Sequence, residues 1–358
     1  MADNAFTEYG LHGEVGTDAF WAAVPGPLSV PAGDGWRTLF LWRGAEARVV
    51  FESWSEPVAL TRWAGTDCWY AEVPMPERLR VTYQFMVGED AHADPFNPAG
   101  AGGDRSVAAT PDAPAQPHWP AVGADAVLPV PSARVRWASA RLGGRRTVRL
   151  HPVGGGGPLV LLLDGDDWLY LHPATTAFDS AVAAGELPPV TLAFLPAKDR
   201  EAEYTCRPEL WEAVRDELLP LVAESGVPAD LSRLVVAGQS LGGLSALYGA
   251  LEFPELIAGV ACQSGSFWWT PEAIGSADPL GGAVGGSMAD LLRDAELGGL
   301  RVAFDVGEHE REMLPHCALV EELVRGAGAE VRVSRGAAGH DRAGWRGALV
   351  RDVGWVVG

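Results

Sequence analysis

A serine in a glycine-rich turn is the residue of this chain best suited to chemistry. Ser240 is the central residue of GQSLG, a G-x-S-x-G pattern that Gly243 extends, with LVVA before it and LSALYGALEF after it. This order predicts a strand, a sharp turn and a helix, with glycines where side chains would collide with the neighbouring backbone. The turn would expose the hydroxyl beside the first amides of the helix, where negative charge is stabilised. The pattern indicates a nucleophilic serine, and its alternative is an ordinary strand-helix turn.

A serine hydroxyl is a poor nucleophile at neutral pH, so it needs a base, and the base needs a carboxylate to orient it. In folds where the order along the chain is serine, acid, histidine, the base lies near the carboxyl end. His340 meets this condition, because it stands in GAAGHDRAGW directly after the expected strand EVRVSRG. We therefore expect His340 to be the base rather than a solvated loop residue.

The carboxylate is expected in the loop after the preceding strand, LRVAFDVG, which continues into EHERE. Glu308, Glu310 and Glu312 compete for this role, and Asp305 is a weaker candidate because it lies inside the strand. The spacing of these residues does not separate them.

A metal site is the other interpretation of this region, with His309, Glu310 and His316 as ligands. The spacing is not H-E-x-x-H, and no further cluster supports it, so we expect no metal. The cysteines form no CxxC pair, which favours a reducing compartment over a zinc or disulfide framework; they are Cys68, Cys206, Cys262 and Cys317.

An oxyanion formed on the substrate would need at least two amide donors. The amide of Leu241 is one candidate. The second is the amide of Gly165 or Asp166, in LLLDGDDW at the end of an apolar run. The alternative for these two residues is a turn that simply ends the strand.

The bulk properties place limits on the partners. The chain has 358 residues, 47% of them hydrophobic, and a net charge of -20, which predicts a globular protein of two domains that does not bind nucleic acid. The first residues, MADNAFTEYG, lack the features of a signal peptide, and no apolar run reaches the roughly 18 residues of a membrane span. We expect a cytoplasmic protein, and its oligomeric state stays open.

The pattern of apolar residues differs between the first and the second part of the chain. Short runs such as RTLFLWRG and RVTYQFMVG predict antiparallel strands, with Trp42, Trp63 and Trp69 in or near the core of an all-β, immunoglobulin-like sandwich. From residue 97 to 126, Pro, Gly, Ala and Asp replace periodic apolar residues, so we expect no regular element there. Beyond it, apolar strands alternate with amphipathic helices, which predicts a parallel-rich sheet covered on both faces. We set the domains at 1–100 and 127–358, with a linker at 101–126.

These blocks resemble the enterochelin (enterobactin) esterase family, Fes-like proteins. The resemblance rests on VVAGQSLGGLSALYGALEFPELIAGVACQSGSFWW, on LLLDGDDW, DREAEYT and GHDRAGWRGAL in the family's order, and on FLWRG, GTDCWY and YQFMVGEDAHADPFNP in the amino-terminal part. It implies an esterase D-type α/β hydrolase that follows the family's amino-terminal domain. The implied activity is hydrolysis of the trilactone esters of ferric catecholate siderophores in the cytoplasm, without a cofactor, iron entering only with the substrate.

The resemblance also assigns roles. Ser240 would be the nucleophile and His340 the base. The family's acid lies in a G-x-x-E loop, which places Glu310 in register with Gly307 and favours it over Glu308. Arg311 and Glu312 follow where relatives often carry an apolar residue, and this departure keeps Glu308 as the alternative.

A ferric tris-catecholate is a bulky aromatic trianion, so cations and flat rings should contact it. Arg200, in DREAEYT, and Arg342, beside the expected base, are the candidate cations. Trp268 and Trp269 are the candidate rings. The alternatives are that Arg200 pairs with Glu203 and that the tryptophans belong to the core.

Two other functions stay open. A general esterase of the esterase D type would use the same three residues on another acyl ester. A non-catalytic protein would use the β domain for binding and the second domain as a scaffold. The amino-terminal blocks argue against the first alternative, and the intact Ser240 and His340 argue against the second.

Overall fold

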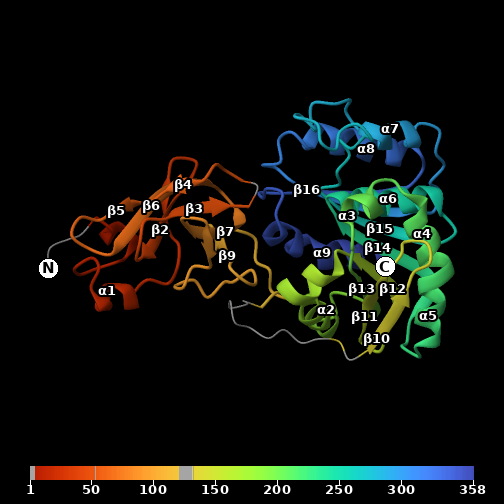
Figure 1. The fold of residues 1–358 in the computed structure, drawn as a ribbon, viewed down its shortest axis with the longest axis horizontal. Coiled ribbons are helices and arrows are strands. Elements are labelled where there is room, and N and C mark those ends of the chain that lie inside the picture. Colours follow the sequence, from red (N-terminus) through yellow and green to blue (C-terminus); the bar gives the residue numbers. More distant parts are fainter. Residues whose placement is uncertain (1–4, 53, 121–130, 132) are drawn as a thin grey trace. The chain divides into compact units, whose positions relative to one another are not determined.

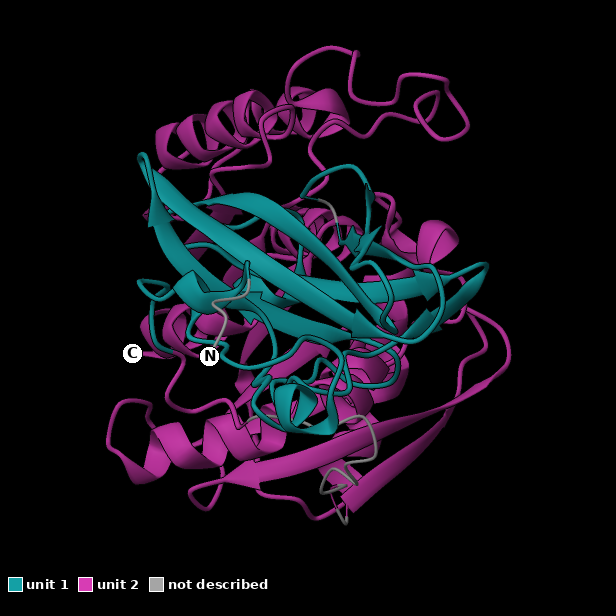
Figure 2. Ribbon diagram, turned by 90° about the vertical axis from the view of Figure 1, so that its left-hand side faces the viewer, with its two compact units in different colours: residues 1–115, 121–127, 337–344 teal, residues 116–120, 128–336, 345–358 magenta. Residues whose placement is uncertain are grey.

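The computed structural model describes residues 5–52, 54–120, 131 and 133–358. Its contacts divide these residues into two compact units (Figure 2). The first, here called the β unit, holds residues 5–52, 54–115 and 337–344, and the second, the α/β unit, holds residues 116–120, 131, 133–336 and 345–358. The last part of the expected linker, 121–126, lies outside the described residues.

Two antiparallel sheets build the β unit. The first has the strand order β1-β2-β6-β5, and the second has the order β4-β3-β7-β8 with β9 also paired to β7. A 3-10 turn, η1 (Thr7–Tyr9), and a short helix, α1 (Asp18–Ala22), precede them. The strands are β1 (Leu28–Ala32), β2 (Gly35–Arg43), β3 (Arg48–Phe51), β4 (Val58–Ala59), β5 (Thr61–Arg62), β6 (Cys68–Pro76), β7 (Arg80–Val87), β8 (Asp90–His92) and β9 (Ser106–Ala109).

The core of the β unit lies between the two sheets. Phe40 and Val73 from the first sheet and Val49, Tyr83 and Phe85 from the second are all almost fully buried in one cluster. Val81, Tyr83 and Phe85, alternate residues of β7, all point into this core, as a strand with one buried face requires. The expected tryptophans are half-buried and pack against the cores of this unit: Trp42, Trp63 and Trp69.

One expectation for this region is wrong. Residues 97–126 were expected to hold no regular element, yet β9 (Ser106–Ala109) forms there and pairs with β7 through Thr82 and Val107, among others. Four small residues carry no apolar period, so only the tertiary pairing identifies this strand.

The α/β unit is built on an eight-stranded sheet of order β10-β11-β13-β12-β14-β15-β16-β17 (Figure 1). The six strands β12 to β17 run parallel, as the apolar runs predicted, and an antiparallel pair that the sequence analysis did not identify, β10 and β11, extends one edge. The bounds are β10 (Ala133–Ala138), β11 (Arg145–Val153), β12 (Pro158–Leu163), β13 (Val190–Leu195), β14 (Asp230–Gln239), β15 (Ile257–Gln263), β16 (Arg301–Gly307) and β17 (Glu330–Gly336).

Helices cover both faces of this sheet. Leu161 points into a core shared with α4 to α8, whereas the adjacent Leu162 points into a second core shared with α2 and α9, as successive residues of a strand must. The helical segments are η2 (Asp167–Leu171), α2 (Ala174–Ala183), α3 (Arg200–Tyr204), α4 (Pro208–Ala213), η3 (Val214–Leu218), α5 (Leu219–Glu224), α6 (Leu241–Glu252), α7 (Gly286–Leu292), α8 (Leu314–Gly326) and α9 (Arg342–Val357).

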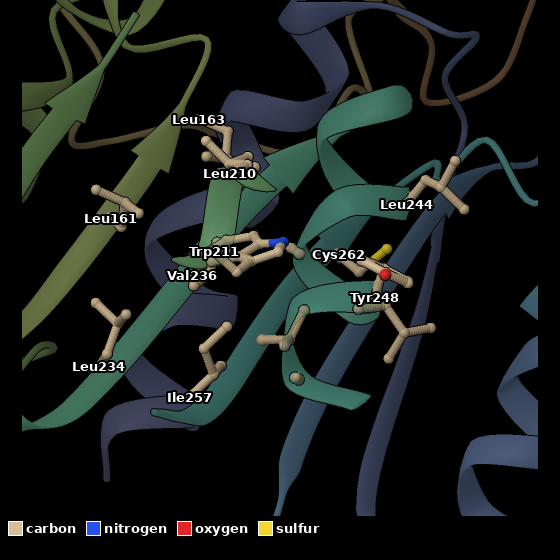
Figure 3. Close-up of a cluster of buried hydrophobic side chains, with 14 of the residues drawn as sticks. Leu161, Leu163, Leu210, Trp211, Leu234, Val236, Leu244, Tyr248, Ile257 and Cys262 are labelled. Carbon is tan, nitrogen blue, oxygen red and sulfur yellow. The ribbon is translucent and has the colours of Figure 1, made fainter. Parts of the chain in front are cut away.

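The larger of these cores holds α6 against the sheet (Figure 3). Trp211 of α4 packs directly on α6 at Gly249, where a Cβ would lie 2.4 Å from the indole. The segments α4, η3 and α5 follow one another and bury apolar residues at helical spacing, all of them fully buried: Leu210, Val214, Leu218 and Val222. No helix in the described part of the chain has the length and apolar character needed to cross a membrane.

Candidate active site

Ser240 lies where β14 ends and α6 begins, at the carboxyl edge of the parallel strands. Its backbone has φ 56° and ψ -122°, a strained conformation for a residue with a side chain. Two hydrogen bonds hold it, one to the last residue of β15 and one from the loop after β15: the Ser240 amide donates to the Gln263 carbonyl at 3.0 Å, and the Ser266 amide donates to the Ser240 carbonyl at 3.0 Å. The local structure is the strand-turn-helix that a nucleophilic serine requires.

The glycines around Ser240 do not all serve the same purpose. A Cβ on Gly238 would lie 2.2 Å from the Gly242 carbonyl oxygen, and a Cβ on Gly243 would lie 3.0 Å from the Cys262 sulfur. A Cβ on Gly242 would meet nothing closer than Leu163 at 3.5 Å, an ordinary contact. The expectation that a side chain would collide is therefore wrong for Gly242, which faces the end of β12 with room to spare.

A second hydroxyl accompanies the serine. The Oγ atoms of Ser240 and Ser266 are 3.1 Å apart, and Ser266 is completely buried. Ser266 is not among the residues expected at the site, although it lies just beyond β15, the strand next to β14. A hydroxyl at this position can hold the Ser240 side chain in one rotamer before a base engages it.

The loop after β16 gives the three competing glutamates different surroundings. Glu308 and Glu312 are exposed, whereas Glu310 is only 6% exposed. Its Oε1 accepts hydrogen bonds from the Ser264 hydroxyl (2.5 Å) and from the Gly307 amide (2.9 Å). A buried carboxylate held by two donors has the fixed orientation that a triad acid needs.

A further link fixes this carboxylate. The Ser264 hydroxyl that donates to Glu310 also accepts a hydrogen bond from the Trp345 indole at 2.8 Å, so α9 and the end of β15 both support the acid loop. Neither Ser264 nor Trp345 was identified from the sequence. Asp305 is occupied elsewhere, because it accepts from the Ser334 hydroxyl at 2.6 Å and from Arg351 at 3.4 Å, and burial raises its pKa.

His340 is half-buried and lies four residues beyond the end of β17. The loops that carry the expected acid and the expected base start side by side, because Gly307 and Gly336 are register partners and the Glu308 amide donates to the Gly336 carbonyl at 2.8 Å. By its contacts, however, the segment that holds His340, residues 337–344, belongs to the β unit (Figure 2). No motif around His340 predicts this assignment.

The expected oxyanion donors lie at the ends of neighbouring parallel strands, β12 and β14. Leu241 is the first residue of α6, so its amide has no partner within the helix. Gly165 is packed so closely that a Cβ would lie 2.4 Å from the Leu195 amide nitrogen. Asp166 is exposed, and its pKa is raised by desolvation and by the neighbouring Asp167.

Arg200 braces these two strand ends. Its Nε and Nη2 donate to the Asp164 carboxylate at 2.9 and 3.0 Å, and Nη2 also donates to the Gln239 carbonyl at 3.1 Å. The pairing that we considered as an alternative, with Glu203, does not form, because Glu203 makes a buried two-bond ion pair with Arg146. The Arg200 side chain nevertheless stays 37% exposed.

The other expected substrate contacts differ in exposure. Trp268 is half-buried at the edge of the core, whereas Trp269 is 8% exposed and belongs to the core itself. The Arg342 guanidinium lies 3.9 Å from the Glu52 carboxylate and is 21% exposed.

The metal interpretation of this region finds no geometric support. His316 accepts the Gly285 amide at Nδ1 (3.1 Å), and its Nε2 lies 3.3 Å from the Leu280 carbonyl. Among the described residues, no three His, Cys, Asp or Glu side chains come together as metal ligands would.

Comparison with known proteins identifies the family. Residues 139–356 match the family model "Esterase: Putative esterase". The Iron(III) enterobactin esterase of Dickeya dadantii (strain 3937) is 30% identical, with 96% of this chain and 94% of that protein aligned, and that of Escherichia coli (strain K12) is 28% identical over 94% and 96%. The crystal structure of the enterobactin esterase FES from Shigella flexneri in the presence of enterobactin matches with a TM-score of 0.82 and 28% identity, over 96% of this chain and 99% of that one. The chain therefore belongs to the esterase family, in the branch of the enterobactin esterases.

Proposed function

We propose that this protein is a serine esterase that hydrolyses the trilactone esters of ferric catecholate siderophores such as enterobactin and so allows iron to be released. The observation that carries the proposal is the extent of the similarity. It covers 96% of the chain with relatives named Iron(III) enterobactin esterase, and it includes the β unit as well as the region that the family model matches.

The residues of the site support a covalent mechanism. Ser240 attacks the ester carbonyl while His340 takes its proton, and Glu310 orients the imidazole and stabilises its charged form. The amides of Leu241 and of Gly165 or Asp166 stabilise the oxyanion. The alcohol leaves with the proton from His340, and water then releases the acyl group by the same steps. The burial of Glu310 and the strained backbone of Ser240 support these roles.

The substrate must be recognised against the protein's own charge. A ferric tris-catecholate carries three negative charges, and this chain has a net charge of -20. A local cation is therefore needed, and the part-exposed Arg200 beside Asp164 supports that role, with Arg342 as the second candidate. Trp268 is the ring proposed for stacking; the burial of Trp269 fits a core position better.

The compartment and partners of the enzyme and the fold of its β unit can also be proposed. We propose that the enzyme works in the cytoplasm on a small-molecule substrate, with no cofactor, no nucleic acid and no membrane partner; its net charge supports the exclusion of nucleic acid. We also propose an immunoglobulin-like fold for the β unit, which two antiparallel sheets around a shared core support.

The test is mass spectrometry of the products formed from iron-loaded enterobactin. We expect the wild type to yield linear dihydroxybenzoyl-serine oligomers and Ser240→Ala to yield none while it still binds the ligand. Cleavage of p-nitrophenyl esters without cleavage of the siderophore would favour a general esterase. Failure of a folded wild type to react with a fluorophosphonate would favour the non-catalytic alternative.

A further inference from the structure

The residue after the expected base is a buried carboxylate that no step of the proposed mechanism uses. Asp341 has no exposed surface. It accepts hydrogen bonds from the Thr82 amide (2.5 Å), from the Thr82 hydroxyl (2.7 Å) and from the Ala343 amide (2.7 Å). Thr82 and Asp341 are 259 positions apart in the sequence, yet both lie within the β unit. The segment 337–344 is therefore fastened to β7 by a side chain adjacent to His340.

Thr82 is in a position to hold this segment firmly. It is 2% exposed in a strand that pairs with β3, β8 and β9, and its carbonyl accepts the Glu52 amide at 3.0 Å. Its own amide donates to Asp341, while the amide of its partner Val107 donates to the Ala99 carbonyl. The backbone amide of Thr82 thus donates to the segment 337–344 instead of to a neighbouring strand.

The electrostatics of this contact are consistent with a fixed acceptor. Burial and the nearby Glu52 raise the pKa of Asp341 to about 6, and the hydrogen bonds from Thr82 and Ala343 act in the opposite direction by favouring the charged form. Arg342 lies 3.9 Å from Glu52 and adds a positive charge to the same surroundings. Thr82 supplies two of the hydrogen bonds that favour the ionised carboxylate.

We propose that Thr82 is a positioning residue for ester hydrolysis, which acts through Asp341 to fix the backbone that carries His340. The inference rests on the proposed function only in taking His340 as the base. A general base must lie within about 3 Å of the proton it accepts, and a displacement of about 1 Å lowers the rate roughly a hundredfold. An anchor on the next residue limits such displacements.

The primary variant is Thr82→Val, which keeps the shape and the backbone amide but removes the hydroxyl donor. Its matched control is Thr38→Val, because Thr38 is another buried threonine of the β unit whose hydroxyl contacts Ser29 at 2.8 Å. Thr82→Ser restores the donor. We expect Thr82→Val to lower kcat about 10-fold to 100-fold with KM within about twofold, Thr38→Val to keep the wild-type kcat, and Thr82→Ser to recover most of the loss.

The rate at which a fluorophosphonate labels Ser240 is the decisive readout, because it needs the base but not recognition of a siderophore. Slow labelling of Thr82→Val alone supports the inference, even if siderophores prove not to be the substrate. Wild-type labelling of Thr82→Val, or equal slowing in Thr38→Val, overturns it.

Asp341→Asn provides a second route that does not depend on the folding of Thr82→Val. It keeps one acceptor and is expected to slow labelling similarly. If Thr82 acts through Asp341, the double variant labels no more slowly than Asp341→Asn alone. Losses that multiply in the double variant overturn the inference.

Discussion

The assignment of the acid gives a sharp prediction, tested by Glu310→Gln. The substitution changes little of the packing, because the glutamine carbonyl can accept the same hydrogen bonds that the Ser264 hydroxyl and the Gly307 amide now give to Oε1. The substitution removes the negative charge of the side chain and replaces its second carboxylate oxygen, Oε2, with an NH2 group, which donates hydrogen bonds. The thermal midpoint should therefore stay near the wild-type value while catalysis is lost.

The size of the loss follows from the work of a triad acid. An amide NH2 cannot accept the imidazole N–H, so the ring adopts the tautomer that presents N–H to the serine, and the charge that stabilises the imidazolium is gone. Such a change lowers kcat by roughly 10³ to 10⁴, equivalent to about 4 to 5.5 kcal/mol of transition-state stabilisation. KM should stay within about threefold, because the interaction is made in the transition state.

The assay is steady-state hydrolysis of the ferric siderophore followed by chromatography, together with the rate of fluorophosphonate labelling. Glu308→Gln is the matched control, since it makes the same chemical change two residues away on an exposed side chain, and it should retain kcat within about twofold. A Glu310→Gln enzyme with more than a tenth of the wild-type kcat would refute the reasoning. A severe loss in Glu308→Gln instead would assign the acid to that residue.

Two other perturbations test the surroundings of the site. Arg200→Gln removes the hydrogen bonds that join Asp164 to Gln239, so kcat on a neutral p-nitrophenyl ester should fall about tenfold. The loss of the cation should also raise KM for the trianionic siderophore about tenfold. An unchanged rate on the neutral ester would contradict the structural role and leave substrate contact as the only role of Arg200. Asp352 is 1% exposed and lies beside Arg351. Desolvation and the nearby Asp305 raise the pKa of its carboxyl group. The contribution of Asp352 to the stability of the folded state therefore falls as pH rises above the ordinary carboxyl pKa near 4. The thermal stability of Asp352→Asn relative to the wild type should therefore increase from about pH 4 to about pH 7 and then level off, whereas a pH-independent difference would contradict this.

Parts of the fold that depend on local pattern could be predicted from the sequence. The strands β12 to β17 are continuous apolar runs, because a parallel strand buried on both faces must be, and the turn at Ser240 is marked by glycines that steric contact requires at two of three positions. β9 is a short run of small residues, and in β10 exposed arginines alternate with Val135 and Trp137. β9 carries no apolar period, so its pairing partner decides its structure, whereas the alternation in β10 is a short local signal for a half-buried strand.

The same division holds within the site. Ser240, His340 and the group of glutamates could be selected because residue type and order along the chain restrict them. The G-x-x-E spacing of the family favours Glu310 over Glu308, and the structure adds its burial and its hydrogen bond from Ser264, which lies 46 residues away. The contact between Thr82 and Asp341 joins residues 259 positions apart in the sequence. No local pattern predicts that a backbone amide of β7 donates a hydrogen bond to the loop after β17.

This contact offers a physical reason for the two-unit chain. The family model spans residues 139–356, yet similarity to the enterobactin esterases covers 96% of the chain. An α/β unit alone would keep Ser240 and Glu310 on its own strands but would leave the Asp341 carboxylate without the two donors that Thr82 supplies. Of its three hydrogen bonds, only the one from the Ala343 amide would remain. On the proposed role of Thr82, the β unit takes part in hydrolysis by holding the backbone beside His340.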